Sequence, residues 1–301
     1  MMRARLLVPA TALAALLVAP SSALALNINE SYQPQNEFKL DPWISINVFG
    51  IDMSINKAVF YVVAASLLAC VTLIWISRRM QMKPNRVQAM VEVYYDLITN
   101  ITRGNLTGQM VNRWFPFMAA LFLFLWFSNM LGYLPLPTNT EHMVTILGIE
   151  VPSLALYAAT ANISVPLALT LMVVISYHIE GVRAKGPVRY VKGWVPAGVT
   201  GVAAVPIFFI EVISQFVRII SLSVRLFANI LAGHLLILFM GGGLVVLLNL
   251  AIIGSLVLGL VTGTLAVAFY IFEVGLVATL QAFIFTTLSA IYLGGAVAEE
   301  H

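Results

Sequence analysis

Residues 226–272 decide the fold: LFANILAGHLLILFMGGGLVVLLNLAIIGSLVLGLVTGTLAVAFYIF. The stretch contains no Lys, Arg, Asp or Glu, and it lies inside an apolar region that covers residues 204–293. That region is long enough for three or four ordinary membrane spans of about 20 residues, or for two unusually long tilted helices that meet near Gly241–Gly243 or a little beyond. Because its middle carries no charge, the charge rule for membrane topology leaves its orientation open.

The composition of the whole chain indicates a membrane protein. Of its 301 residues, 60% are hydrophobic and 10% are charged, whereas soluble domains are about 45–50% apolar and about 25% charged. A single soluble core of this size cannot bury so many long apolar runs. The net charge of +3 comes from basic residues that stand between apolar segments, so we expect no binding of nucleic acid.

Three further apolar runs predict membrane spans at residues 58–76, 115–134 and 154–179. Clusters of Lys and Arg follow the first and the third run, and the positive-inside rule places both clusters in the cytoplasm. The loop at residues 135–152 contains no Lys or Arg, as expected of a loop outside the cytoplasm. The basic residues are Arg78, Arg79, Lys83 and Arg86 after the first run, and Arg183, Lys185, Arg189 and Lys192 after the third.

Two segments beside the first span have patterns of their own. Residues 1–25 have the features of a secretory signal, with Arg3 and Arg5, a short apolar run and the small-x-small site Ala23–Ala25. We expect cleavage after Ala25, and an uncleaved anchor is the alternative. Residues 87–103 carry apolar side chains at helical spacing, which predicts a helix that lies on the cytoplasmic membrane surface or packs on other protein.

A narrow polar stripe crosses the first half of the long apolar region. At about 100° per residue, its members fall within about 40° of Arg225 on the helix circumference. A pairing of Glu211 with Arg218 seven residues later is one structural explanation, with Arg225 extending to an interface. Arg225 itself has no acid within ten residues and cannot lose its proton, so we expect its partner on another polypeptide. The stripe consists of Glu211, Ser214, Arg218, Ser221, Arg225 and Asn229.

Two more ionisable residues stand in this apolar region. His234 points roughly 180° away from Arg225 on a regular helix, and Glu273 ends the uncharged stretch. Each has a structural interpretation as a hydrogen-bonding group between helices. The functional alternative is a proton relay, because His and Glu in a wet pocket exchange protons near neutral pH.

Several motifs resemble one known family. SLSVRLFANILAGH at residues 221–234 is similar to the signature of subunit a of F-type ATP synthases. LQAFIF at residues 280–285 with IYL at residues 291–293 resembles that family's final helix. FSNMLGYLP at residues 127–135 and TANIS at residues 160–164 resemble its second and third spans. The resemblance covers roughly residues 114–301, and the arginine block is its most specific part.

The resemblance implies a function and a set of roles. Arg225 would face the c ring, attract the ring carboxylate as that group releases its proton, and block leakage between two half-channels. Asn229 and Gln281 would flank it, Glu211 would serve one half-channel, and His234 with Glu273 would serve the other. Ser221, Arg218, Asn162 and Tyr292 are possible supporting residues. The partners implied are the c ring, the subunit b peripheral stalk, the lipid bilayer and protons, with no cofactor and no metal.

One spacing departs from the family. Glu273 lies eight residues before Gln281, whereas the family's ionisable position lies seven before. On a regular helix the extra residue rotates Glu273 about 80° away from Gln281. A one-residue π-bulge between the two would absorb it, so we predict an irregular turn there if Glu273 serves the proton path.

The sequence thus predicts an all-α integral membrane protein with five membrane helices, the last two long and tilted, and one amphipathic surface helix. We expect a non-catalytic, proton-translocating subunit of a bacterial plasma membrane, with its N-terminus outside and its C-terminus in the cytoplasm. A secondary ion-coupled transporter is the alternative, but it would typically show internal repeats. The expected segments are a signal at 1–25, an extracytoplasmic segment at 26–56, the first span and surface helix at 57–113, a two-span hairpin and cytoplasmic loop at 114–192, and a tilted hairpin facing the c ring at 193–301.

Overall fold

A computed structural model of the chain describes residues 38–40, 42–48, 51–52, 54–80, 85–146, 149–195, 199, 201–243, 248 and 252–298. The predicted signal segment lies outside these residues. The chain divides into two units. The larger unit comprises Leu40–Leu134, Ala158–Ile230 and Val277–His301, and the smaller unit comprises Met1–Lys39, Pro135–Tyr157 and Leu231–Leu276.

Five helices in the described part of the chain are long and apolar enough to cross a membrane, which confirms the predicted fold class. The last two contain 39 and 44 residues, or about 58 Å and 66 Å at 1.5 Å per residue. A hydrocarbon core is about 30 Å thick, so helices of this length must tilt or extend beyond it. The five are α2 (Lys57–Arg79), α4 (Gln109–Gly132), α5 (Ser164–Lys185), Ala204–Gly242 and Gly254–Val297.

The two long helices contain irregular turns. The first consists of α7 (Ala204–Leu238) and the π-helical turn η5 (Phe239–Gly243). The second consists of α9 (Ile252–Phe272), the π-helical turn η6 (Glu273–Val277) and α10 (Ala278–Val297). The sequence left open either extra short spans or two long helices, and the structure has the two long helices.

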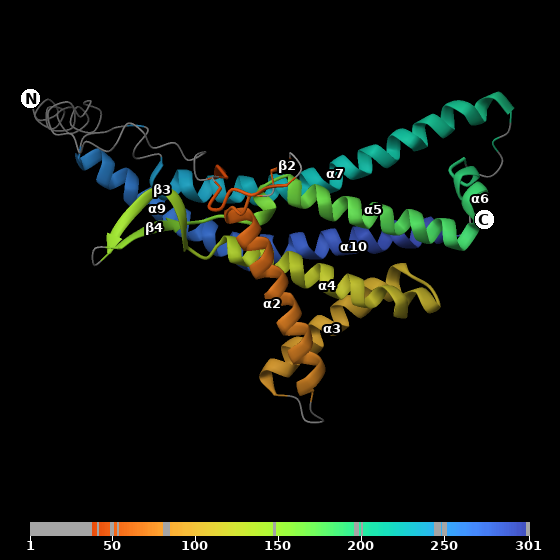
Figure 1. The fold of residues 1–301 in the computed structure, drawn as a ribbon, viewed down its shortest axis with the longest axis horizontal. Helices are drawn as coiled ribbons and strands as arrows, with labels where there is room; N and C mark the ends of the chain where they lie inside the picture. The colour runs from red at the N-terminus through yellow and green to blue at the C-terminus, as the bar shows by residue number, and fades with distance from the viewer. Residues whose placement is uncertain are drawn as a thin grey trace, which may run out of the picture. The chain divides into compact units, whose positions relative to one another are not determined.

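Helix α10 is the centre of the larger unit and runs beside α4 and α5 (Figure 1). Its buried face carries small side chains such as Ala278, Ala282 and Ala290, which allow the neighbouring helices to approach closely. At one end, the Arg113 guanidinium at the start of α4 pairs with the buried Glu180 carboxylate near the end of α5 at 2.8 Å. There too, Lys185 Nζ donates to the Ala298 carbonyl at 2.6 Å. Helices α5 and α10 therefore end on the same side.

The predicted amphipathic helix is α3 (Arg86–Asn105). Its second half packs on α4 and α10, where Ile98 and Ile101 are buried. Its first half is different, because Met90 is 76% exposed and Val93 is 70% exposed. Packing on protein thus accounts for the second half of the helix and leaves an uncovered apolar face on the first.

The third span begins later than the sequence predicted. Residues 149–155 form the strand β4 (Ile149–Ala155), which pairs antiparallel with β3 (Leu136–Ile146). Helix α5 starts at Ser164, after the 3₁₀ turn η3 (Ala159–Ala161), and the Asn162 side chain accepts a hydrogen bond from the Ser164 N–H at 2.9 Å. The predicted start at residue 154 is wrong, because an apolar run alone does not distinguish the end of a strand and a 3₁₀ turn from the first turns of a helix.

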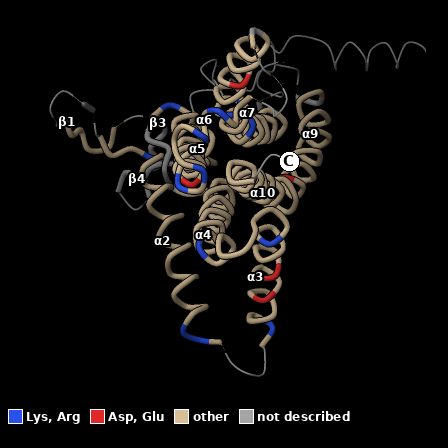
Figure 2. The backbone as a smooth tube through the Cα atoms, turned by 90° about the vertical axis from the view of Figure 1, so that its right-hand side faces the viewer, with Lys and Arg blue, Asp and Glu red and all other residues tan. Residues whose placement is uncertain are grey.

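The remaining described elements are short. Strands β1 (Asn47–Val48) and β2 (Ile51–Asp52) pair antiparallel before α2. Helix α6 (Pro187–Lys192) follows α5, and the 3₁₀ turn η4 (Gly201–Ala203) precedes α7. Charged residues concentrate at helix ends and in α3 and α6 (Figure 2), as in the last turns of α2 with Arg78 and Arg79 and of α5 with Arg183 and Lys185.

We predict that Gly294→Ala destabilises the larger unit. A Cβ atom at Gly294 would collide with the backbone carbonyl oxygen of Asn105, where α10 crosses the end of α3. Such overpacking typically costs about 1–3 kcal/mol, so the thermal stability of the detergent-solubilised complex should fall. Gly295→Ala is the matched control, because a Cβ there meets no atom within 4 Å. Equal stability of the two variants would contradict this packing.

Candidate functional site

Helix α7 presents different chemistry on its two faces around Arg225. Leu222, Leu226 and Ile230 recur every four residues and are buried, whereas Val224 and Arg225 are exposed. The exposed face is otherwise apolar and includes Ile210, Ile213, Val217 and Ile220. Within the described residues, no acidic side chain forms an ion pair with Arg225. The chain thus presents a permanent cation at the border of an uncovered apolar face.

Asn229, one turn after Arg225, connects α7 to α10. Its Nδ2 donates to Gln281 Oε1 at 2.9 Å, and Gln281 is buried at 2% exposure. The resemblance to the family implied that Asn229 and Gln281 flank Arg225, and in the structure these two side chains contact each other. This hydrogen bond fixes the rotation of α7 about its axis at the level of the arginine.

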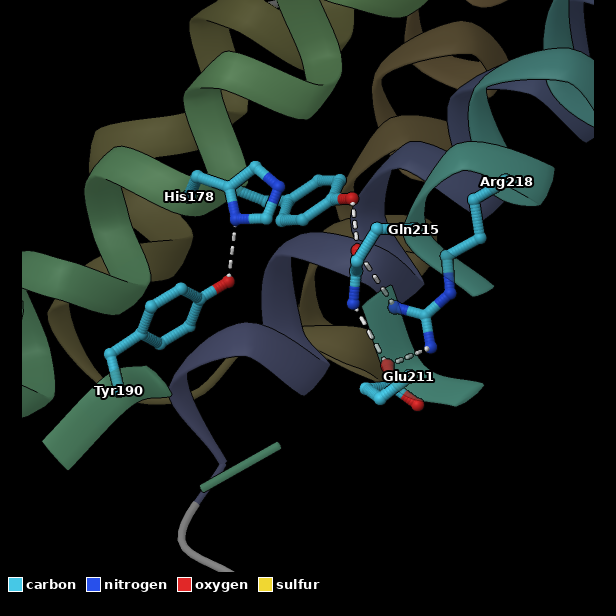
Figure 3. Close-up of polar contacts among 6 residues, drawn as sticks. His178, Tyr190, Glu211, Gln215 and Arg218 are labelled. Carbon is cyan, nitrogen blue, oxygen red and sulfur yellow. Dashed lines mark hydrogen bonds and ion pairs between the residues drawn. The ribbon is translucent and has the colours of Figure 1, made fainter. Parts of the chain in front are cut away.

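Arg218, seven residues before Arg225, has several partners (Figure 3). Its Nη2 lies 3.2 Å from Glu211 Oε1, which confirms the predicted pair. Gln215 Nε2 donates to the same Glu211 oxygen at 2.8 Å, and the Tyr177 hydroxyl donates to Gln215 Oε1 at 2.7 Å. Arg218 also lies over the Tyr292 ring at 5.6 Å from its centroid, a cation–π contact. Arg218 is therefore neutralised within the chain, in contrast to Arg225.

Gln215 was missed by the sequence analysis. It is neutral, so a search for intramembrane charges passes over it. Its position four residues after Glu211 and three before Arg218 is the signal that identifies it, because side chains at these spacings are neighbours on a helix.

A cavity of about 440 Å³ opens beside this polar cluster. Its walls come from the ends of α5, α6, α7 and α10, with Glu211, Arg218 and Lys185 as charged lining residues. Behind them, the Tyr190 hydroxyl contacts His178 Nδ1 at 2.9 Å (Figure 3). Burial raises the pKa of Tyr190, so this hydroxyl stays protonated at neutral pH. The cavity therefore combines space for water with a carboxylate at its edge.

His234 and Glu273 lie in the smaller unit, and both are buried. A Cβ atom at Gly233 would lie 2.5 Å from Glu273 Cδ. The absence of a side chain at Gly233 thus lets the Glu273 carboxyl group approach the residue that precedes His234. Glu273 thus lies beside the residue next to His234, and a relay between the two stays a prediction.

Glu273 also begins the π-helical turn η6 (Glu273–Val277). This confirms the irregular turn that the eight-residue spacing to Gln281 predicted. A π turn contains one more residue than an α turn, which is the irregularity that the eight-residue spacing from Glu273 to Gln281 was expected to require. The role of Glu273 in a proton path stays a prediction.

Two of the possible supporting residues make only local contacts among the interactions described. The Ser221 hydroxyl donates to the Arg218 carbonyl at 3.3 Å within α7. Asn162 accepts from the Ser164 N–H and so stabilises the start of α5. Tyr292, by contrast, joins the cluster around Arg218.

Comparison with known proteins decides the family. The family described as ATP synthase A chain matches residues 59–294. The chain belongs to this family. Curated relatives named ATP synthase subunit a include those of Parvibaculum lavamentivorans, 32% identical over 89% of this chain and 94% of the relative, and Paramagnetospirillum magneticum, 33% identical over 88% and 98%. The relative from Brucella ovis is 34% identical over 89% and 98%. Family membership links the chain to ATP synthesis and ion transport in a membrane.

If Glu273 serves the proton path, Gly233→Ala should lower ATP synthesis by the assembled complex at least about tenfold, because small displacements of a group that takes part in a reaction have large effects on its rate. The added methyl group must displace the Glu273 carboxyl group. Gly263→Ala on α9 is the control, since a Cβ there meets no atom within 4 Å. ATP synthesis in inverted vesicles, normalised to the amount of complex, measures both. Native activity of the Gly233→Ala complex would show that the placement of Glu273 is irrelevant to transport.

Proposed function

We propose that this chain is the proton-translocating stator subunit of an F-type ATP synthase, with two half-channels that lead to a c ring. It makes no covalent bond itself, and the chemistry of ATP synthesis takes place on other subunits. The observation that carries the proposal is Arg225, an exposed cation on α7 without an acidic partner among the described residues of its own chain.

A fixed charge at the exposed face of a membrane helix needs a partner outside the chain. A charged side chain at the centre of a bilayer costs roughly 2.5–3.5 kcal/mol or more. Arg cannot avoid this cost by losing its proton, since its pKa exceeds about 12. A carboxylate on a neighbouring subunit would compensate the charge, and the uncovered apolar side chains around Arg225 suit contact with other apolar helices. A ring of c subunits, each with one carboxyl group, meets both requirements.

The polar cluster at Glu211 supports a half-channel on the side where α5 and α10 end. Its cavity of about 440 Å³ holds a carboxylate beside space for water. The neighbouring end of α5 and the short helix α6 are basic. Arg183 and Lys185 lie in the last turn of α5, and Arg189 and Lys192 lie in α6. Basic loops favour the cytoplasm, so we assign this half-channel to the cytoplasmic side.

His234 and Glu273 support the second half-channel. His234 lies nine positions after Arg225 and on the opposite side of α7 by helical geometry. A proton that enters here would reach a ring carboxylate and neutralise it. The ring would then rotate away from Arg225, and after nearly a full turn the carboxyl group would release its proton towards the cytoplasmic half-channel. Arg225 attracts the resulting carboxylate and blocks direct leakage between the two paths.

The proposed complex also defines the orientation of this chain. We place its N-terminal segment outside the bacterial plasma membrane and its C-terminus inside, with subunit b of the peripheral stalk as a second partner. The hydrogen bond from Lys185 to the Ala298 carbonyl supports a common side for the end of α5 and the C-terminus. Protease-accessible tags inserted near Arg183 and at the C-terminus should be cleaved only from the cytoplasmic side, and cleavage of the Arg183 tag from outside would reverse the assignment.

Replacement of Arg225 tests the proposed function. Arg225→Ala should abolish proton-driven ATP synthesis and allow passive proton leakage through the membrane sector, because the barrier between the half-channels is lost. Arg225→Lys should not restore synthesis, since a compact ammonium lacks the delocalised guanidinium fork. Arg103→Ala, which removes an exposed arginine near the end of α3, is the control and should keep native activity. Normal synthesis by the Arg225→Ala complex in sealed vesicles would refute the proposal.

A further inference from the structure

The one additional residue between Glu273 and Gln281 is confined to the π turn η6, and some contact has to keep it there. A one-residue insertion in a free helix would rotate everything after it by about 100°. A π turn persists only where the structure on both sides prevents that rotation, since regular α-helical hydrogen bonding is otherwise preferred. The residues on either side of η6 should therefore be fixed by contacts of their own.

The first side of the turn is fixed within the smaller unit. The carboxyl group of Glu273 lies against Gly233, where even a methyl group would find no room. Glu273 is buried, at 8% exposure. A rotation of the helix at this point would move the buried carboxyl group away from Gly233.

The second side is fixed within the larger unit by three hydrogen-bonding side chains. Asn129 Nδ2 donates to the carbonyl of Ala278, the first residue of α10, at 3.2 Å. The Thr160 hydroxyl donates to Asn129 Oδ1 at 2.9 Å, which holds the amide group with its N–H towards Ala278. Next to it, Trp126 Nε1 donates to Thr279 Oγ1 at 3.1 Å. We call Asn129, Thr160 and Trp126 the α10 anchor.

The burial of these groups makes the anchor strong. Asn129, Thr160 and Ala278 each have an exposed fraction of 0%. A rotation of α10 that moved the Ala278 carbonyl would leave the Asn129 amide without its acceptor, which is unfavourable because a buried polar group that loses its partner gains no compensating bond to water. Gln281 lies three residues after Ala278, and its bond with Asn229 depends on the same rotation.

We propose that Asn129 is a positioning residue for the proton path: by binding Ala278 it holds α10 in register, so that the extra residue between Glu273 and Gln281 stays inside the π turn. This inference rests on the proposed function for its activity assay, but not for its structural assay. It assigns Asn129 no contact with a proton or a ring carboxylate.

Two single-residue deletions test the register. Deletion of Gly275, inside the π turn, and deletion of Leu280, after the anchor, both shorten the spacing from Glu273 to Gln281 to seven residues, and both residues are exposed. If the anchor fixes Ala278, the Gly275 deletion converts the turn to α-helix and keeps Gln281 in place. The Leu280 deletion instead rotates Gln281 by about 100° from Asn229. ATP-driven proton pumping should survive the first deletion and be lost in the second. Equal activity in the two would overturn the proposal.

Removal of the anchor gives a second activity test. Asn129→Leu together with Thr160→Val replaces both hydrogen-bonding partners by apolar groups, which leaves no buried polar side chain orphaned at either position. We expect pumping to fall about tenfold in the native background and by less than about twofold when Gly275 is also deleted, because coupled sites show non-additive effects. A merely structural role would give the same loss in both backgrounds, and that result would contradict the proposal.

A structural readout keeps the test independent of activity. In a Cys70→Ser background that also carries Asn229→Cys and Gln281→Cys, a short bifunctional thiol reagent should cross-link the two positions in full complexes within membranes, since the native side chains are close enough to hydrogen-bond. Adding Asn129→Leu and Thr160→Val should reduce the cross-linked fraction several-fold, with equal amounts of chain in the purified complex. An unchanged fraction would overturn the proposal, whereas failure of the Arg225 experiments would leave this readout intact.

Discussion

The packing around α7 depends on one arginine that cannot lose its charge, in an apolar region that contains very few charged residues. Arg225 and Glu273 flank a run of 47 residues that contains no Lys, Arg, Asp or Glu. In our proposal its charge is balanced from outside the chain, so the arginine has to stay uncovered while another face of α7 packs on the rest of the chain. The burial of Leu222, Leu226 and Ile230 and the hydrogen bond from Asn229 to Gln281 meet this requirement.

Two arginines on α7 have different electrostatic surroundings. Arg218 lies one heptad earlier and has a carboxylate, an amide and an aromatic ring as partners. Its charge is compensated locally, and it stabilises a polar cavity. Arg225 lies at nearly the same angle on the helix but beyond the reach of that cluster. The same residue type therefore has a structural role at one position and, in our proposal, a transport role at the other.

The sequence predicted much of this because charges in an apolar chain are rare and costly. The apolar runs predicted the membrane spans and the spacing of a few charges suggested the pair of Glu211 with Arg218, whereas the two long helices and the irregular turn after Glu273 were expected from the resemblance to the family. The start of α5 was mispredicted because residues 154–163 are largely apolar, although in the structure they comprise the end of β4 and the turn η3. Gln215 and the α10 anchor were missed because a search for intramembrane charges passes over neutral amides and hydroxyls. Their significance arises when residues far apart in the chain, such as Asn129 and Ala278, meet in space.

The most direct test of the central claim is an experimental structure of the assembled membrane sector, in which the distance from the Arg225 guanidinium to the nearest carboxylate is measured. Our account predicts that a carboxylate of a neighbouring ring subunit lies within about 4 Å, or one water molecule further, in at least one rotational state. An Arg225 side chain that faces lipid in every state, or that pairs with a carboxylate of its own chain, would contradict the account.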